Sequence, residues 1–267
     1  MHPTLCSILG LDVPSYAVLV SIGIVLAAWV RRREVARLGY DRTPGHPFIG
    51  FAALLGGLFG SKLGMVLFVP PDELMRLGLA ALDFDFTGKT VVGGIAGGYL
   101  GVELAKKVVG VRHSTGDAFA VALPLAQGVG RIGCFLHGCC VGAETHGPLG
   151  IVIAGVPRHP AQLYETVLDF ALAAGIWSIR ARPRPAGHLF KLTLVGYATI
   201  RFALEPRRGD TGWMVGPLTA VQVVCALAIV GFGGVLVRGR GSVSGAGTSP
   251  QGGEAAGAPT PAPVATE

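Results

Sequence analysis

The stretch YAVLVSIGIVLAAWVRRREVAR, from Tyr16 to Arg37, decides the fold class of this chain. Its first fifteen residues carry no charged side chain, and the next seven include four arginines and one glutamate. An uncharged apolar run that ends in a basic cluster is typical of a membrane span whose basic end lies in the cytoplasm. No basic segment precedes the run and no small-residue cleavage site ends it. We therefore expect a permanent membrane helix rather than a cleavable signal peptide.

The composition of the whole chain extends this prediction. Of the 267 residues, 51% are hydrophobic and only 14% are charged, with a mean hydropathy of +0.56, which does not describe a water-soluble surface. Apolar runs recur at close to the length of about 20 residues that crosses a bilayer. We predict an all-α, polytopic membrane protein with about seven transmembrane helices. The seven runs cover Tyr16–Val30, Phe48–Val69, Val91–Val109, Asp117–Leu136, Gln162–Ile179, His188–Leu204 and Pro217–Val237.

Basic residues divide unevenly between the loops that join these runs. If the loops alternate across the membrane from an external N-terminus, 13 of the 22 Lys and Arg residues lie in internal loops, 5 in external loops and 4 inside runs. Because cytoplasmic loops collect basic residues, this favours an N-terminus outside and a C-terminus inside. The net charge of +6 then reflects topology and attraction to anionic membrane lipid, so we expect no nucleic-acid partner.

The end of the chain differs in composition from the rest. Residues 241–267 are mostly Gly, Ala, Pro, Ser and Thr, with almost no large apolar side chain. Such a segment cannot bury enough surface to offset the entropy lost on ordering. We predict a transmembrane domain over residues 1–240 and a disordered cytoplasmic tail over residues 241–267.

Two arginines, Arg131 and Arg201, lie inside predicted spans, where an unpaired charge costs about 2.5–3.5 kcal/mol. Arg201 shares a helical face with Tyr197 and, one turn further, with Glu205. One interpretation is a site for an anionic head group, because guanidinium donors grip phosphate oxygens. The other is a structural salt bridge from Arg201 to Glu205 or to Glu165. The sequence pattern leaves both open.

The segment GVGRIGCFLHGCCVG, Gly128–Gly142, adds three cysteines and a histidine. The C-x4-C-C spacing is not the C-x2-C pair of a structural zinc site, so we expect no metal site and no cofactor. A disulfide is conceivable if the segment lies at the outer face, although the adjacent cysteines are poorly placed to pair with each other. Free buried thiols that act as small apolar groups are the remaining interpretation.

Five segments together resemble the prolipoprotein diacylglyceryl transferase family, whose members are multi-pass enzymes of the bacterial inner membrane. The pattern G-R-x-G-x-F, followed by R-x-P-x-Q-L-Y-E, is the most specific part of this resemblance. It covers nearly the whole chain except the tail. The segments are PSYAVLVSIGIVLAAW, GSKLGMVLF, VVGGIAGGYLG, GVGRIGCFLHGCCVG, and RHPAQLYE with the later GYATIRFALEPRRGD.

The resemblance implies an activity and a set of site residues. Such enzymes transfer the diacylglyceryl group of phosphatidylglycerol to the lipobox cysteine of preprolipoprotein signal peptides and release glycerol phosphate. Since a thiolate is the nucleophile, a base is needed to take the thiol proton. The implied catalytic residues are Arg131, Arg201, Tyr197, His137 and Glu165. The implied phosphatidylglycerol-binding residues are Arg131, Arg201, Tyr16, Gly142, Gln162, Arg208 and Cys134.

The sequence departs from the family pattern at one position that matters for the chemistry. Val92 stands where the family's H-G-G motif has a histidine, which is a candidate base. His137 or Glu165 then takes the proton, or the histidine is dispensable, or the chain is a silent paralogue that binds lipid or lipoprotein. A transporter or channel is a further alternative, because intramembrane arginines also line transport pathways.

Overall fold

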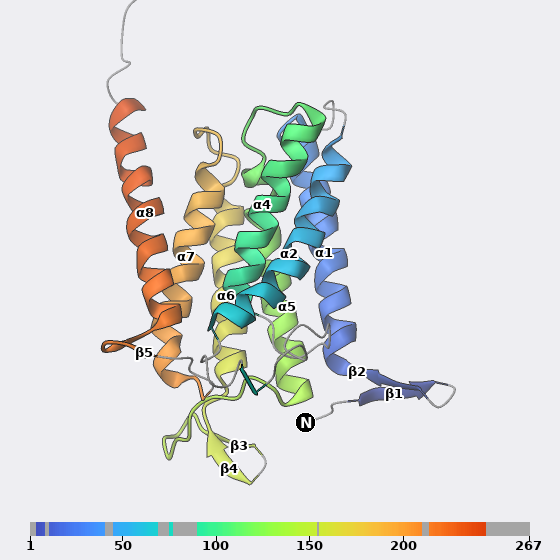
Figure 1. Cartoon of the computed structure of the whole chain (residues 1–267), viewed down its shortest axis with the longest axis vertical. Coiled ribbons are helices and arrows are strands. Elements are labelled where there is room, and N and C mark those ends of the chain that lie inside the picture. The colour runs from blue at the N-terminus through green and yellow to red at the C-terminus, as the bar shows by residue number, and fades with distance from the viewer. Residues whose placement is uncertain are drawn as a thin grey trace, which may run out of the picture.

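The computed structural model describes residues 4–8, 11–40, 45–68, 75–76, 90–153, 155–209 and 214–243. Within them, seven helices of 16 to 24 residues stand side by side as a bundle (Figure 1). They are α1 (Ser15–Arg37), α2 (His46–Phe68), α4 (Val91–Val109), α5 (Ala122–His137), α6 (Ala161–Ile179), α7 (His188–Leu204) and α8 (Ala220–Val243).

In the described part of the chain, three short antiparallel hairpins lie at one end of the bundle (Figure 1). The first pairs β1 (Thr4–Ile8) with β2 (Leu11–Pro14) just before α1. The second and third stand before α6 and α8, respectively, so the chain enters each of these three helices from the hairpin end. They pair β3 (Ile151–Ile153) with β4 (Val156–Arg158), and β5 (Met214–Val215) with β6 (Leu218–Thr219).

Each of the seven predicted apolar runs contains one of these helices, although the seventh starts with β6 and becomes helical only at Ala220, and the fourth is interrupted near its start. It begins as the 3-10 helix η3 (Gly116–Phe119), and α5 begins only at Ala122. Pro124 has no N–H to donate to the Ala120 carbonyl, which a continuous α-helix would require. The Thr193 hydroxyl of α7 donates to that carbonyl instead, at 2.8 Å.

The predicted boundary between the transmembrane domain and the tail falls near the end of helix α8. Helix α8 continues to Val243, three residues into the segment that the composition assigns to the tail. The helix that the apolar run forms therefore continues through the small residues that follow the run. The rest of the predicted tail, residues 244–267, lies outside the described residues.

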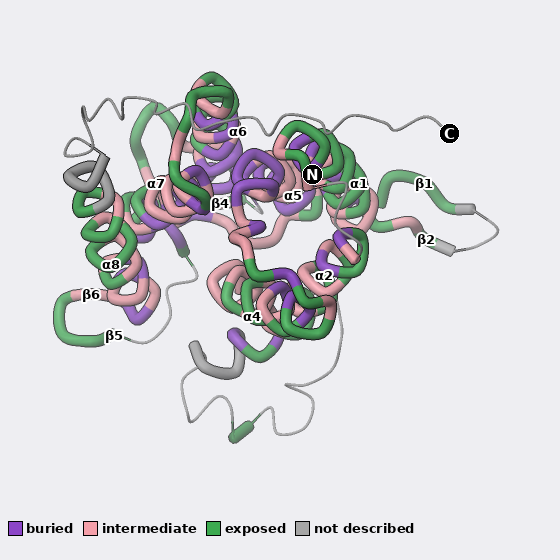
Figure 2. Tube along the Cα trace, turned by 90° about the horizontal axis from the view of Figure 1, so that it is seen from above, coloured by how far each residue is buried: buried purple, intermediate pink, exposed green. Residues whose placement is uncertain are grey.

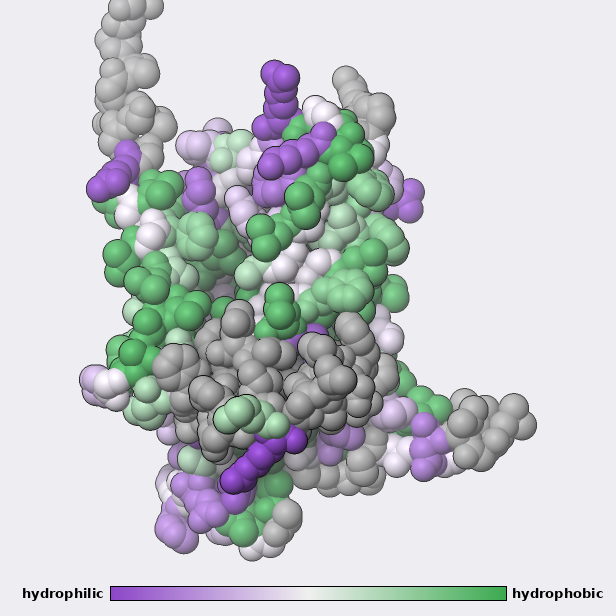
Figure 3. Space-filling model, viewed as in Figure 1, coloured by the Kyte–Doolittle hydropathy of each residue, from purple (hydrophilic) through white to green (hydrophobic). Residues whose placement is uncertain are grey.

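Apolar side chains cover the flank of the bundle, and polar side chains gather at its two ends (Figure 3). Among the residues that the structure describes, four helical segments are long and apolar enough to cross a membrane. Large apolar residues such as Leu104 and Val230 are exposed on these flanks, and a water-soluble protein rarely exposes an apolar surface this extensive. These features identify a helical membrane protein. The four segments are Ser15–Arg37, His46–Gly64, Gly116–His137 and Ala220–Arg238.

Glycines allow α2 and α4 to pack with their backbones in contact. A Cβ added to Gly97 would lie 2.2 Å from the Gly56 carbonyl oxygen, and one added to Gly60 would lie 2.4 Å from the Gly93 carbonyl oxygen. No real Cβ atom fits at such distances, so each of these positions needs glycine. Glycines four positions apart on each helix therefore form a small-x-x-x-small packing surface.

Helix α5 occupies the centre of the bundle, with α1, α6, α7 and the α2–α4 pair around it (Figure 2). Its candidate span is 44% buried inside the protein, against 17–28% for the other three. A charged residue on the buried face of α5 can therefore meet protein rather than lipid, and Arg131 on this helix is buried.

Candidate functional site

Three segments that are far apart in sequence meet at the hairpin end of the bundle: the loop after α5, the β4–α6 junction and the 3-10 helix η4 (Glu205–Arg207). Their backbones are hydrogen-bonded to one another. Gly142 N–H donates to the His159 carbonyl at 3.1 Å, and Ala143 N–H donates to the Arg207 carbonyl at 2.9 Å. These backbone hydrogen bonds fix the positions of the polar side chains around them.

Glu165, on the second turn of α6, binds two guanidinium groups. One carboxylate oxygen lies 2.9 Å from Arg131 Nη2, and the other lies 3.4 Å from Arg208 Nη1. The Tyr197 hydroxyl of α7 donates to the first oxygen at 3.4 Å. All four residues are buried. We call Arg131, Glu165 and Arg208 the arginine–glutamate network.

Arg201 has a separate carboxylate partner. Its guanidinium pairs with Glu205, which also accepts a hydrogen bond from the Thr219 hydroxyl at 3.0 Å. The structure therefore contains one of the two salt bridges that the sequence left open. Arg201 nevertheless lies close enough to Glu165 to act on its charge, so this pair borders the arginine–glutamate network.

Arg131 and Gln162 each have a buried polar atom without a hydrogen-bond partner. Arg131 Nε, on a side chain that is only 8% exposed, has no acceptor. The Gln162 side chain donates to the Cys139 carbonyl at 2.7 Å, but its own oxygen has no donor. Buried donors and acceptors are normally satisfied, so such atoms need an explanation. A ligand that offers both an acceptor and a donor would supply it.

Gly142 has a packing role in the structure. A Cβ at this position would lie 2.2 Å from the His159 carbonyl oxygen and 2.8 Å from the Arg207 carbonyl oxygen. Gly142 also forms a backbone bridge with Arg208. The glycine therefore lets the loop after α5 approach both neighbouring segments and holds Arg208 beside the network.

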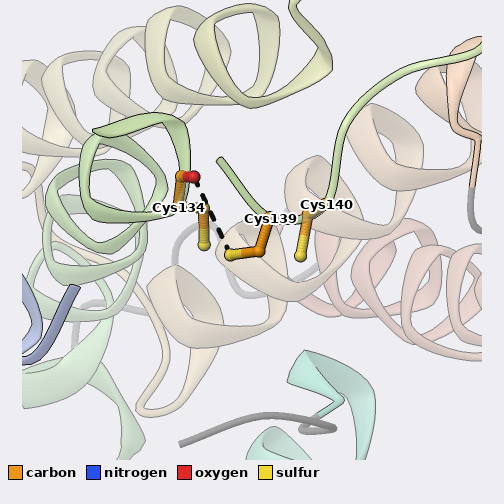
Figure 4. Close-up of side chains that lie close together, drawn as sticks. All are labelled: Cys134, Cys139 and Cys140. Carbon is orange, nitrogen blue, oxygen red and sulfur yellow. Dashed lines mark hydrogen bonds between the residues drawn. The ribbon is translucent and has the colours of Figure 1, made fainter. Parts of the chain in front are cut away.

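The remaining predicted residues lie around the C-terminal end of α5. The Tyr16 and His137 rings face each other with centroids 6.2 Å apart. Cys134 is buried on α5, and Cys139 and Cys140 lie in the loop directly after it (Figure 4). Hydrogen bonds with Cys134 and Cys139 lower the pKa of the Cys140 thiol, and the guanidiniums of Arg131 and Arg208 favour its charged form as well.

A small cavity of about 10 Å³ lies against Tyr197 and is large enough for about one water molecule. Val91 and Ile95 of α4 line it, so the N-terminal end of α4 faces the Tyr197 side of the site. Val92 is the direct chain neighbour of Val91 and is partly buried. This cavity does not hold a lipid head group, which would have to displace side chains to enter.

One buried acid was not identified in the sequence. Asp169 lies one helical turn after Glu165 on α6, is 0% exposed, and neither of its oxygens has a hydrogen-bond partner. The i, i+4 spacing in QLYETVLD would have placed it on the face of Glu165. A carboxyl group buried in this way is costly, which makes it a marker of a polar site.

Comparison with known proteins gives one consistent result. A family model described as prolipoprotein diacylglyceryl transferase matches residues 3–238, a range that contains every residue of the arginine–glutamate network. A phosphatidylglycerol–prolipoprotein diacylglyceryl transferase of Clostridium tetani is 30% identical over 246 residues, covering 86% of this chain and 94% of that protein. A protein of the same name from Vibrio vulnificus is 33% identical over 248 residues, covering 86% and 89%.

Proposed function

This chain belongs to the prolipoprotein diacylglyceryl transferase family, and on that premise we propose that it transfers the diacylglyceryl group of phosphatidylglycerol to the lipobox cysteine of preprolipoproteins. In this reaction a C–S bond forms at a glycerol carbon and the C–O bond to the phosphate breaks. The leaving glycerol phosphate takes the electron pair, and the thiol gives up its proton. The site must therefore hold a phosphodiester and receive a proton.

The unsatisfied Arg131 Nε–H is the observation that carries this proposal. Arg131 pairs with Glu165 through one terminal nitrogen, and its buried Nε donor has no acceptor. A phosphodiester oxygen is a strong acceptor for such a donor. Charge that develops on the phosphate as the C–O bond breaks is stabilised by the same guanidinium, which Glu165 has already oriented.

The other residues take supporting roles in this proposal. Arg201 and Arg208 flank the phosphate, and Tyr197 orients Glu165 through its hydroxyl. Gln162, Gly142, Cys134 and Tyr16 shape the pocket on the phosphatidylglycerol side. His137, beside Tyr16, and Glu165, at the centre of the network, are the two candidates for proton removal.

An open apolar face of α1 supports a place for the lipid's acyl chains. It extends along one side of the helix from Ala17 to Trp29. It begins one residue after Tyr16, so it leads away from the polar site along the bundle. Acyl chains lying there would remain in contact with membrane lipid while the head group reaches Arg131.

We also propose that all seven helices cross the inner membrane, with the N-terminus outside, the C-terminus inside and the hairpin end at the outer face. The distribution of basic residues supports this orientation. The exposed Cys6 of β1 provides a test. A membrane-impermeant maleimide should label Cys6 in intact spheroplasts, and labelling only after lysis would contradict the orientation.

The activity is tested with purified protein in detergent, phosphatidylglycerol and a lipobox peptide. We expect a mass increase on the peptide that equals one thioether-linked diacylglyceryl group, and no increase when the peptide cysteine is replaced by serine. If a histidine-containing relative forms product under the same conditions and this chain does not, the chain is a silent paralogue and the proposed activity is wrong.

A further inference from the structure

The thiols of Cys134, Cys139 and Cys140, here called the cysteine trio, converge at one point (Figure 4). All three sulfur atoms lie within 4.8 Å of one another. A zinc–thiolate bond of about 2.3 Å places the sulfurs of a planar three-thiolate site about 4.0 Å apart. Small side-chain rotations would therefore bring the trio around one ion. The C-x4-C-C spacing is not that of a structural zinc site, so the sequence did not predict a metal site. The fold nevertheless brings the three thiols close together.

The end of α5 brings Cys139 back to Cys134. Gly138 adopts a left-handed conformation with φ of 85°. The N–H groups of Gly138 and Cys139 both donate to the Cys134 carbonyl, at 3.0 and 3.1 Å. A helix end of this kind places the residue after the glycine against the side chain that precedes the last turn. Two thiols occupy that contact here.

A strained backbone conformation turns the third thiol to the same side. Cys140 has a φ of 56° and is the sole non-glycine residue with positive φ in the part of the chain that the structure describes. Adjacent residues of an extended chain point to opposite sides, and the left-handed conformation at Cys140 removes that alternation. Strain at a non-glycine residue persists only where its surroundings hold it, and it concentrates at functional sites.

The loop that carries the trio is held from outside as well. Gln162 binds the Cys139 carbonyl at 2.7 Å, and the Gly142 N–H binds the His159 carbonyl at 3.1 Å. The two loop cysteines are thus fixed between α6 and the β4 segment. A preorganised set of ligands loses little conformational entropy when it binds an ion.

We propose that the cysteine trio is a binding site for one thiophilic d10 metal ion such as Zn²⁺ or Cu⁺, and that it borders the proposed phosphatidylglycerol site through Cys134. Three soft thiolates select such ions over Mg²⁺ or Ca²⁺. A divalent ion with three thiolates carries one net negative charge. The nearby Arg131 guanidinium therefore attracts the loaded site, whereas it would repel a bare cation.

The test uses metal alone, without lipid or peptide. Full-length protein in a Cys6→Ser background is reduced, desalted without oxygen and titrated with CdCl₂, whose thiolate complexes absorb in the ultraviolet. We expect one Cd²⁺ per chain, and protein loaded first with Zn²⁺ should exchange it for Cd²⁺, because the softer ion binds thiolates more tightly. Serine at any one of the three positions should weaken binding by at least about tenfold. Cys225→Ser, which removes a buried thiol of α8, should leave binding unchanged.

Thermal melting in the same detergent separates loss of a ligand from loss of the fold. Zn²⁺ should raise the melting temperature of the parent protein and of Cys225→Ser, but not that of Cys140→Ser. Equal cadmium affinity in a triple serine variant would overturn the proposal. A Cys134–Cys139 disulfide that forms in the isolated protein and leaves no metal affinity after reduction would overturn it as well.

Discussion

Glu165 holds Arg131 with one carboxylate oxygen, at 2.9 Å, and Arg208 with the other, at 3.4 Å. Both partners are arginines from different parts of the chain, so the glutamate joins the central helix α5 to the segment after α7. Arg131 pairs with the carboxylate through a terminal nitrogen, and its Nε has no acceptor, which leaves that donor for a second anion. Glu165 therefore positions the guanidinium groups in addition to balancing their charge.

Arg131→Lys tests whether the site needs only a positive charge at this position or also the hydrogen-bond donor geometry of arginine. Lysine keeps the positive charge and can reach Glu165, but it has no donor equivalent to Nε. If that donor holds the phosphate, we expect turnover to fall about 100-fold or more while the melting temperature changes little. Turnover is measured as diacylglyceryl transfer to the lipobox peptide. Unchanged turnover in the lysine variant would remove Arg131 Nε from the site.

The adjacent residues Arg207 and Arg208, which follow α7, provide a test variant and a matched control. Arg208 is buried and pairs with Glu165, whereas Arg207 is exposed and its side chain donates only to the Ala203 carbonyl, at 3.4 Å, among the hydrogen bonds of the described chain. We expect Arg208→Ala to reduce transfer at least about tenfold and Arg207→Ala to leave it near the parent value, because only one of them touches the network. Equal losses in both variants would point to general surface charge instead.

The apolar runs predicted the limits of α4 and α7 correctly, and local signals at the ends of these two helices explain the agreement. Thr90 caps α4 with its side chain and Gly110 ends it in a left-handed conformation; the predicted limits of Val91 and Val109 agree with the structure. Gly187 likewise precedes α7, whose predicted limits also agree. Capping and glycine signals are local, so a single sequence reveals them.

The partners of the site residues could not be predicted in the same way. Arg131 and Glu165 are 34 positions apart and meet only because α5 and α6 pack side by side. The sequence offered Glu165 and Glu205 equally as partners of Arg201, and the structure selects Glu205. Convergence of the cysteine trio depends on the backbone angles of Gly138 and Cys140, which no spacing rule contains.

Val92→His tests whether the chain lacks a base. The N-terminal end of α4 faces the Tyr197 side of the site through Val91 and Ile95, so a histidine at the neighbouring position lies near that side. A positioned base contributes about 10²–10⁴-fold to a proton transfer, and we expect transfer to the lipobox peptide to rise in the variant. Val92→Leu adds bulk without a base and should not raise it. No rise with histidine would leave proton removal to groups already present.

Gly97→Ala and Gly94→Ala test the contact between α2 and α4. A Cβ at Gly97 would lie 2.2 Å from a carbonyl oxygen of α2, whereas a Cβ at Gly94 would meet nothing nearer than 3.5 Å. We expect Gly97→Ala to lower the free energy of unfolding by about 1–3 kcal/mol, because the two helices must move apart. Gly94→Ala should be neutral or slightly stabilising, since alanine favours a helix. Both effects are measured by denaturation in detergent. Equal stability of the two variants would show that this packing tolerates a methyl group and that the small-x-x-x-small surface does not hold the pair together.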